Sequence, residues 1–189
     1  SDVCSSDLAN KLGSGAATIN VANMGSTGTG GTVVASMDLR GHDSTVNAST
    51  LLIANSTNGT GTNVSGSNGT VSFDTGTFTV GTLNMGLKTG ASTGTARGTL
   101  NVGGGIFTVN TAFTLGSHSG AGASIATLNL TGGTFTSNVN ILKGSSTATS
   151  NINLDGGTLD MTGKNIGSAN TVTVDAKSGT LKNVAEINN

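Results

Sequence analysis

The chain has 189 residues, of which 31 are glycine and 9% are charged, and it contains no proline, tryptophan or tyrosine. Globular proteins average about 25% charged residues and about 7% glycine, so this chain is poor in charge and rich in glycine. The formal net charge of −1 excludes the basic footprint that nucleic-acid binding requires. No apolar run reaches the ~18 residues of a membrane helix, so no membrane insertion by this segment is expected.

Residues 1–8 read Ser-Asp-Val-Cys-Ser-Ser-Asp-Leu. This octapeptide resembles the conceptual translation of a short-read sequencing adapter, which implies a non-native segment that is not part of the fold. Cys4 is the single cysteine of the chain, so without this segment the sequence is free of cysteine. The resemblance also leads us to expect that the reading frame is a fragment.

Residues 9–68 form the less regular part of the predicted fold. Apolar residues alternate with polar ones around Ile19, Met37 and Ile53, as in half-buried strands, but the insertions between these stretches differ in length. Residues 55–68 are rich in Asn, Gly, Ser and Thr and contain the Asn-Gly steps that begin at Asn58 and Asn68. Because Asn-Gly favours tight turns, we expect a protruding, turn-rich loop near residues 55–68.

In residues 69–189, one short phrase occurs in four copies. The copies start at Val71, Leu100, Leu128 and Ile152, which are 29, 28 and 24 residues apart. Each copy has an alternating apolar stretch, a glycine-containing corner and a further apolar residue. A period of this length indicates units that bury their apolar faces only by stacking on one another, as in a β-solenoid.

The copy that starts at Leu100 shows how one repeat forms one coil. Leu100 and Val102 point to the same side of a strand, and Gly103 begins a corner because glycine adopts left-handed backbone angles at little cost. Phe107 begins a second alternating strand, and Phe113 a third. The sequence predicts an all-β fold, a parallel β-helix with about three short strands per coil, about six or seven coils and no caps at its ends.

Stacking of the coils places equivalent residues above one another, about 4.8 Å apart. Three apolar columns are predicted to fill the interior: Phe78, Phe107, Phe135 and Leu159; Val71, Leu100, Leu128 and Ile152; and Phe73, Val102, Leu130 and Leu154. Asn101, Asn129 and Asn153 are equivalent residues between these apolar positions. They are either simple outward polar residues, or their amides hydrogen-bond to one another up the stack.

The phrase Leu-Asn-Leu-Thr-Gly-Gly-Thr-Phe of residues 128–135 and its variant in residues 152–159 resemble the autotransporter-associated β-strand repeats of bacterial surface proteins. The resemblance covers residues 69–189 well and the first third loosely. It implies a right-handed parallel β-helix in a long exported chain, which is extracellular or displayed on the bacterial cell surface. It implies no cofactor, and as partners it implies adjoining repeats of the same chain and an unknown surface ligand or polysaccharide.

The densest polar cluster of the chain consists of Asp38, Arg40, His42 and Asp43. These four residues are the candidate for a small binding site, and the alternative is a solvated turn, since exposed charged residues are common. Neither His42 nor His118 has a second histidine or a cysteine at the spacing of metal ligands, so no metal is expected.

Parallel β-helices also include polysaccharide lyases and hydrolases, whose chemistry requires paired carboxylates. Asp155 and Asp160 flank one corner and could face each other across it, whereas Asp74 lies about three coils from Asp155. Carboxylates of this kind are usually just solvated, so no catalytic residue is expected. The enzyme alternative is a carbohydrate-active lyase or hydrolase whose catalytic coils lie outside this fragment.

A third hypothesis comes from Thr-x-Thr rows, which resemble the ice-binding faces of some antifreeze proteins. The row is interrupted at Ile106 and Asp160, and threonine is also simply a good strand former. The threonines of the row are Thr77, Thr79, Thr134, Thr136, Thr171 and Thr173.

The residues and the family resemblance together favour a non-catalytic structural or adhesive segment of a large exported bacterial repeat protein, acting as a stalk or as a cell-surface passenger. All five phenylalanines fall at inward positions, and no tryptophan or tyrosine is present to stack on sugar rings. This distribution of aromatic residues favours the structural hypothesis over the carbohydrate-active enzyme.

Overall fold

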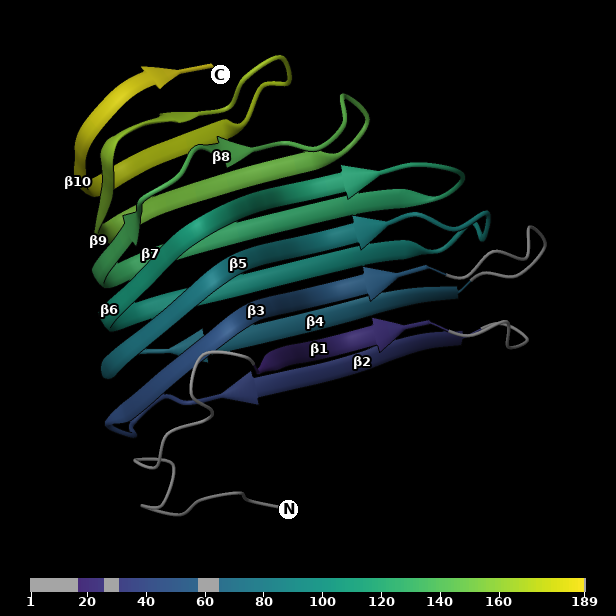
Figure 1. The fold of residues 1–189 in the computed structure, drawn as a ribbon, viewed down its shortest axis with the longest axis horizontal. Coiled ribbons are helices and arrows are strands. Elements are labelled where there is room, and N and C mark those ends of the chain that lie inside the picture. Colours follow the sequence, from purple (N-terminus) through teal and green to yellow (C-terminus); the bar gives the residue numbers. More distant parts are fainter. Residues whose placement is uncertain (1–16, 26–30, 58–64, 189) are drawn as a thin grey trace.

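The computed structural model describes residues 17–25, 31–57 and 65–188. The adapter-like residues 1–8 lie outside this part of the chain. The described residues form ten β-strands and no helix, so none of them belongs to a helix that could cross a membrane (Figure 1). The strands are β1 (Thr18–Met24), β2 (Gly31–Asp38), β3 (Ser44–Ser56), β4 (Ser65–Phe73), β5 (Gly76–Lys88), β6 (Thr95–His118), β7 (Ala123–Ser137), β8 (Ile141–Leu142), β9 (Thr149–Ile166) and β10 (Thr173–Ile187).

All strand pairs are parallel, and the strands belong to one hydrogen-bonded sheet. The main order is β1-β3-β5-β6-β7-β9-β10, in which each strand pairs with a segment about one repeat later in the chain. Leu100 pairs with Leu128, for example, and Leu128 pairs with Ile152. The pairings of β6 with β7, β7 with β9, β9 with β8 and β8 with β6 close a ring of four strands. The predicted all-β class is confirmed.

The strands are longer than predicted. β6 continues for 24 residues through the corner at Gly103, and β9 continues for 18 residues. Register shifts between β6 and β7 mark the corner, on both sides of Gly103, but they do not end the strand. The prediction of short strands separated by corners is wrong in this respect, because neighbouring coils turn at the same place and their hydrogen bonds continue around the bend.

The predicted loop near residues 55–68 is shorter than expected. Asn55 and Ser56 belong to β3, and β4 begins at Ser65. The second Asn-Gly step is therefore inside β4, where a Cβ atom on Gly69 would lie 2.6 Å from the carbonyl oxygen of Val21. Glycine is needed there because another backbone comes close, and not because the chain turns. Residues 58–64, which include the first Asn-Gly step, lie outside the described residues.

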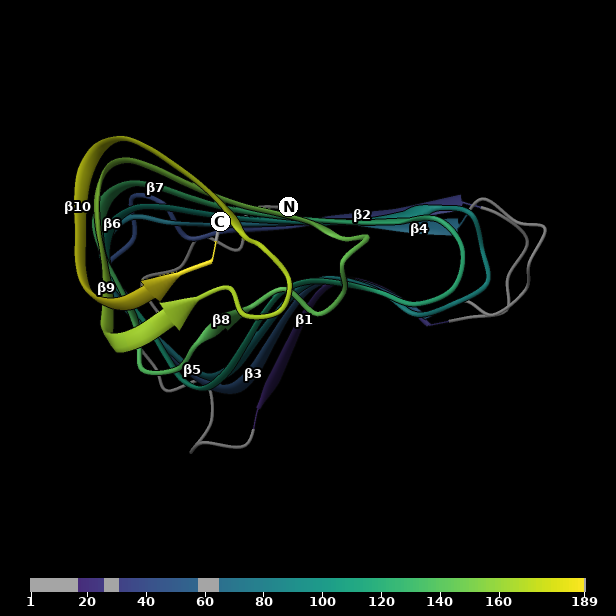
Figure 2. The ribbon, with the colours of Figure 1, turned by 90° about the horizontal axis from the view of Figure 1, so that it is seen from above.

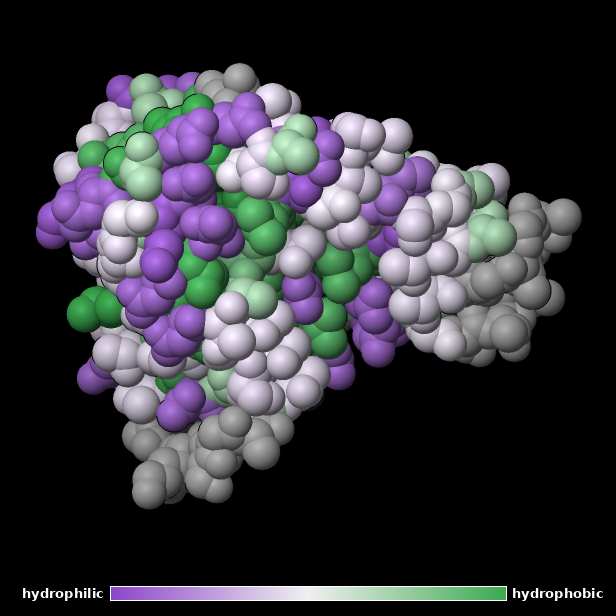
Figure 3. All heavy atoms as spheres, turned by 45° about the horizontal axis from the view of Figure 1, so that its top comes forward, coloured by the Kyte–Doolittle hydropathy of each residue, from purple (hydrophilic) through white to green (hydrophobic). Residues whose placement is uncertain are grey.

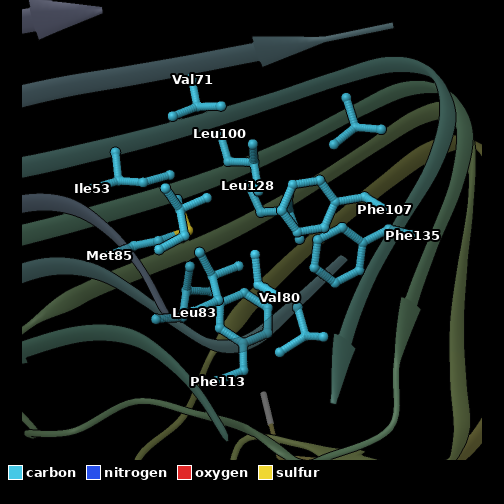
Figure 4. Packing of buried hydrophobic residues seen from close by; sticks show 14 of the residues in the cluster. Ile53, Val71, Val80, Leu83, Met85, Leu100, Phe107, Phe113, Leu128 and Phe135 are labelled. Atoms are coloured by element: carbon cyan, nitrogen blue, oxygen red, sulfur yellow. The ribbon is translucent and has the colours of Figure 1, made fainter. Parts of the chain in front are cut away.

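The three predicted apolar columns form the core. Their members pair in register from coil to coil, and each is at most 1% exposed. The Phe107 ring stacks between the rings of Phe78 and Phe135, with centroid distances of 4.7 Å and 5.2 Å. Figure 4 shows Phe107 and Phe135 next to each other in this core. Phe73 and Phe113 are buried in the same core, so all five phenylalanines point inward as predicted. Each such side chain contributes about 1.5–3 kcal/mol relative to exposure.

The same columns extend toward both ends of the described chain. Val46 pairs with Phe78 in the first column, and a fourth apolar column, which was not predicted, pairs Leu51 with both Ile19 and Leu83. At the other end, Leu181 of β10 pairs with Leu159, but it is only partly buried because β10 pairs with β9 alone. Figure 3, which turns this end toward the viewer, shows apolar and polar residues side by side on the wide part of the molecule.

Seen from above, the coils have a wide part and a narrow arm (Figure 2). Where the arm begins, two stretches of the sheet face each other with their backbones in contact. A Cβ atom on Gly98 would lie 2.6 Å from the Ile53 carbonyl oxygen and 2.7 Å from the Gly86 nitrogen. We call this contact the waist. One side of it is a column of residues with left-handed backbone angles: Ala22 (φ 58°), Ala54 (φ 60°), Gly86 (φ 61°) and Gly116 (φ 81°).

Small side chains hydrogen-bond across the waist and hold its two sides together. The Ser124 hydroxyl donates a hydrogen bond to the Gly86 carbonyl across it, and the Ser150 hydroxyl donates to the Leu115 carbonyl. Beyond the waist, the arm encloses a second, polar interior that includes Ser67 and Lys88, both fully buried. Larger residues at the waist would force the two sheet faces apart, because closely packed sites have no room for an added group.

We expect Phe107→Ala to lower the free energy of unfolding by about 3–5 kcal/mol, because it leaves a cavity between two stacked rings. Its exposed neighbour provides the control: Ile106 is 50% exposed, and Ile106→Thr should change stability by less than about 0.5 kcal/mol. Urea denaturation followed by circular dichroism measures both. An unfolding midpoint of Phe107→Ala equal to that of the parent would contradict the core described above.

Gly98→Ala tests the waist. The added methyl group has no space, so we expect a loss of about 1–3 kcal/mol in the same denaturation assay. Gly103→Ala is the matched control, because a Cβ atom there would approach other atoms no closer than 3.5 Å. If both variants unfold at the same denaturant concentration, the backbones at the waist are not in contact.

Candidate binding surface

The predicted polar cluster lies on the turn between β2 and β3. The Arg40 guanidinium donates two hydrogen bonds to the Asp38 carboxylate, from Nε at 2.9 Å and from Nη2 at 2.7 Å. These bonds lower the pKa of Asp38 from 3.8 to about 2. His42 and Asp43 are exposed on the same turn. The structure therefore joins Asp38 and Arg40 as an exposed ion pair.

Asp74, which was not among the predicted site residues, connects this turn to the next coil. Asp74 Oδ1 accepts hydrogen bonds from the Gly41 amide at 2.8 Å and from the Thr75 hydroxyl at 3.2 Å. Asp38 accepts from the side chain and the backbone of Arg40, and Asp74 accepts from the same turn, so both carboxylates are hydrogen-bonded within the protein. This arrangement favours the solvated-turn interpretation of the cluster over a ligand site.

The two carboxylates that flank a corner have separate partners. Asp155 accepts a hydrogen bond from the Ser178 hydroxyl at 2.8 Å. Asp160 accepts from the Asn183 amide at 2.9 Å and from the Thr162 backbone at 3.0 Å, and these bonds lower its pKa. A carboxyl group that acts as a general acid needs a raised pKa instead. The geometry offers no support for an acid–base pair of Asp155 and Asp160.

Neither histidine belongs to a group of metal-binding side chains in the described part of the chain. His118 Nδ1 lies 2.9 Å from the Thr147 hydroxyl, and its buried Nε2 has no hydrogen-bond partner among the described residues. Within residues 17–25, 31–57 and 65–188, no three His, Cys, Asp or Glu side chains are grouped so that they could hold a metal ion.

The threonine rows are only partly as predicted. Thr77, Ile106, Thr134 and Thr158 pair in one column, and the 50% exposed Ile106 interrupts it. Thr173 pairs with Asn151, which places it in a different column. The expectation that residues 171–173 extend the row is therefore wrong, because Thr173 corresponds to Asn151, which precedes the glycine corner, whereas the row lies after the corner.

Lys88 is the most unusual charged residue, and no sequence signal pointed to it. Its side chain is fully buried in the arm, where Nζ donates to the Gly90 carbonyl at 3.2 Å and to the Ser92 hydroxyl at 2.8 Å. Burial lowers the pKa of this amine because the charged form is desolvated. Its contacts lie within the turn that follows β5, so Lys88 fixes the shape of that turn.

The equivalent asparagines form a hydrogen-bonded ladder. Asn153 Nδ2 donates to Asn129 Oδ1 at 2.7 Å, Asn129 Nδ2 donates to Asn101 Oδ1 at 2.8 Å, and Asn101 Nδ2 donates to Ser72 Oγ at 3.2 Å. The second of the two interpretations left open by the sequence is therefore confirmed. In register, Asp175 continues this column beyond Asn153.

A groove lies over the ladder, and we call it the ladder groove. Its volume is about 590 Å³, within the range of about 300–1,000 Å³ that is typical of ligand pockets. It is open to solvent and lies apart from the predicted cluster. Its lining residues come from β6, β7, β9 and β10 and are all polar: Asn101, Asn129, Thr131, Asn153, Asp155, Asp175 and Lys177.

No protein-family model matches the sequence, and comparisons with curated proteins and with solved structures also gave no match.

We expect nuclear magnetic resonance titration to give the Asp38 carboxyl a pKa of about 2, and Arg40→Gln to return it toward 3.8. Because the pKa in the folded state is lowered, the ion pair stabilises the fold above about pH 3.8, and its contribution is lost as the pH falls through about 2. The contribution is small, since both side chains are more than half exposed. Lys182→Gln, which removes a distant cation, should leave the Asp38 titration unchanged. An Asp38 pKa that does not respond to Arg40→Gln would contradict the assignment of its cause.

Proposed function

We propose that the chain is a section of a right-handed parallel β-helix and serves as a non-catalytic structural or adhesive segment of a large exported bacterial repeat protein. The observation that supports this most directly is the register of the apolar columns. Val71, Leu100, Leu128 and Ile152 follow one another on successive coils, each paired to the next in a parallel ladder. A chain that stacks in this way grows in length by adding coils, as a stalk does.

The direction of the hydrogen bonds supports the stalk role. In a parallel ladder the backbone bonds join neighbouring strands, so in this chain they run along the direction in which the coils stack. β6 and β7, for example, are joined from Thr95 paired with Ala123 to Val109 paired with Ser137. A pull along the stack is therefore shared by many bonds between each pair of coils.

The side chains support a non-catalytic role. Every phenylalanine is committed to the core, so none is exposed to stack on a substrate sugar ring. The carboxylates that flank the corner, Asp155 and Asp160, are engaged with different hydrogen-bond partners. The export and the location on the cell surface follow from the resemblance of residues 69–189 to autotransporter-associated repeats.

Single-molecule force measurements test the stalk role, with handle domains fused to both ends of the chain. We expect stepwise unfolding in which each step releases about 28 residues, or roughly 90–100 Å of extended chain. Each step corresponds to one coil. Release of the whole described chain in a single event would contradict a stack of separable coils, and release of reducing ends from a polysaccharide panel would contradict the non-catalytic assignment.

A further inference from the structure

We propose that the ladder groove binds a neutral, hydroxyl-rich glycan chain that lies along the stacked coils. This inference goes beyond the stalk role and does not require it. The groove has about 590 Å³ of space and seven polar lining residues, among them three amides, one hydroxyl, two carboxylates and one ammonium group. A surface with both donors and acceptors matches a ligand whose hydroxyl groups both donate and accept hydrogen bonds.

The asparagine ladder leaves hydrogen-bonding capacity for a ligand. A side-chain amide has two N–H donors and two acceptor lone pairs. In the ladder, Asn129 uses one N–H toward Asn101 and one lone pair toward Asn153. Its second N–H and second lone pair have no partner among the described residues, although Asn129 lines the groove. The ladder also holds each amide in one orientation, so little side-chain entropy is lost when a ligand binds.

The charged residues of the groove add complementary groups at its β9–β10 side. Asp175 pairs in register with Asn153, and Lys177 Nζ lies 3.6 Å from Asp175 Oδ2. Asp155 holds the Ser178 hydroxyl with one oxygen only, which leaves its second oxygen for a ligand. Carboxylates that accept from sugar hydroxyls form charge-assisted hydrogen bonds, which are stronger than neutral ones.

The same residues disfavour other ligand classes. Two carboxylates against one ammonium give the groove a negative balance, which repels polyanions such as nucleic acid or sulfated glycans. No apolar side chain lines the groove, so it offers nothing to a lipid or an apolar peptide. A calcium ion takes about 6–8 oxygen ligands, and here Lys177 lies beside one of only two carboxylates.

The repeat of the ladder also suits a polymer. Three successive coils present one asparagine each, Asn101, Asn129 and Asn153, about 4.8 Å apart, so an extended glycan meets the same group on three neighbouring coils. Because the groove has no aromatic platform, we expect weak binding for a short oligosaccharide, with a dissociation constant on the order of 0.1–1 mM. A longer polysaccharide that contacts several copies of the protein would bind more tightly through multivalency.

The test is nuclear magnetic resonance titration of the 15N-labelled full chain with three neutral hexasaccharides, cellohexaose, laminarihexaose and mannohexaose, up to about 10 mM. We expect at least one of them to shift the side-chain amide signals of Asn101, Asn129 and Asn153. A heparin hexasaccharide and calcium chloride are the competing probes. Stronger binding of either one at the groove, shifts confined to other surfaces, or no shift with any neutral hexasaccharide would each overturn the proposal.

Variants test whether the glycan binds in the ladder groove and not elsewhere on the surface. Asp175→Ala and Asp155→Ala should each weaken hexasaccharide binding about tenfold or more, because each removes a charged acceptor. Asp38→Ala, which removes an exposed carboxylate outside the groove, should leave the affinity within about twofold of the parent. Thr131→Val keeps the shape of an exposed residue and removes one hydroxyl, so it should weaken binding even if the aspartate variants disturb the fold. Equal affinity of Thr131→Val, Asp175→Ala and the parent would overturn the proposal.

These outcomes are independent of the force measurement. A chain that unfolds coil by coil but shifts with no neutral hexasaccharide keeps the stalk role and loses the glycan site. A chain that binds a hexasaccharide in the groove but unfolds in one event keeps the glycan site and loses the stalk role.

Discussion

The parallel, in-register hydrogen-bond ladder is the constraint on which the rest of the structure depends. Because the strands are parallel and the coils turn at matching places, each residue is held next to the equivalent residue of the neighbouring coil. Phe107 therefore stacks on Phe135, and Asn129 bonds to Asn101. A shift of one residue would turn every apolar side chain of a strand outward, so the apolar columns and the amide ladder fix the register together.

The in-register backbone ladder also explains why the apolar core could be predicted from the sequence. Alternating apolar residues at equal distances from a glycine corner must share a column if the repeats stack, and Phe78, Phe107 and Phe135 do so. The waist could not be predicted in this way. In the sequence, Gly69, Gly98 and Ala126 are simply small residues within strands. Their size matters because a distant stretch of backbone lies against them: Val21 and Ala54 against Gly69, Ile53 and Gly86 against Gly98, and Gly86 against Ala126. The Asn-Gly step that starts at Asn68 has a turn signal that this tertiary contact overrides.

The surface shows a similar division. The proximity of Asp38 and Arg40 followed from sequence, because the two residues lie on one short turn. The ladder groove did not, because its charged part depends on the pairing of Asp175 with Asn153 in a coil that lacks the repeated phrase. Asp74 and Lys88 were likewise missed, since the sequence does not show which backbone groups they meet. Local spacing thus predicts columns, whereas partners from different coils must come from the structure.

The waist gives each coil two compartments that can vary independently. Thr18 pairs with Thr50, 32 positions later, whereas Asn129 pairs with Asn153, only 24 positions later, yet the apolar residues beside them stay in register, Ile19 with Leu51 and Leu128 with Ile152. The difference in length is taken up in the arm. β8 has just two residues, and the chain beyond it turns back before the tip of the arm (Figure 2). Insertions and deletions in the arm therefore leave the packing of the apolar core unchanged. The arm can vary in length and shape without compensating substitutions in the core.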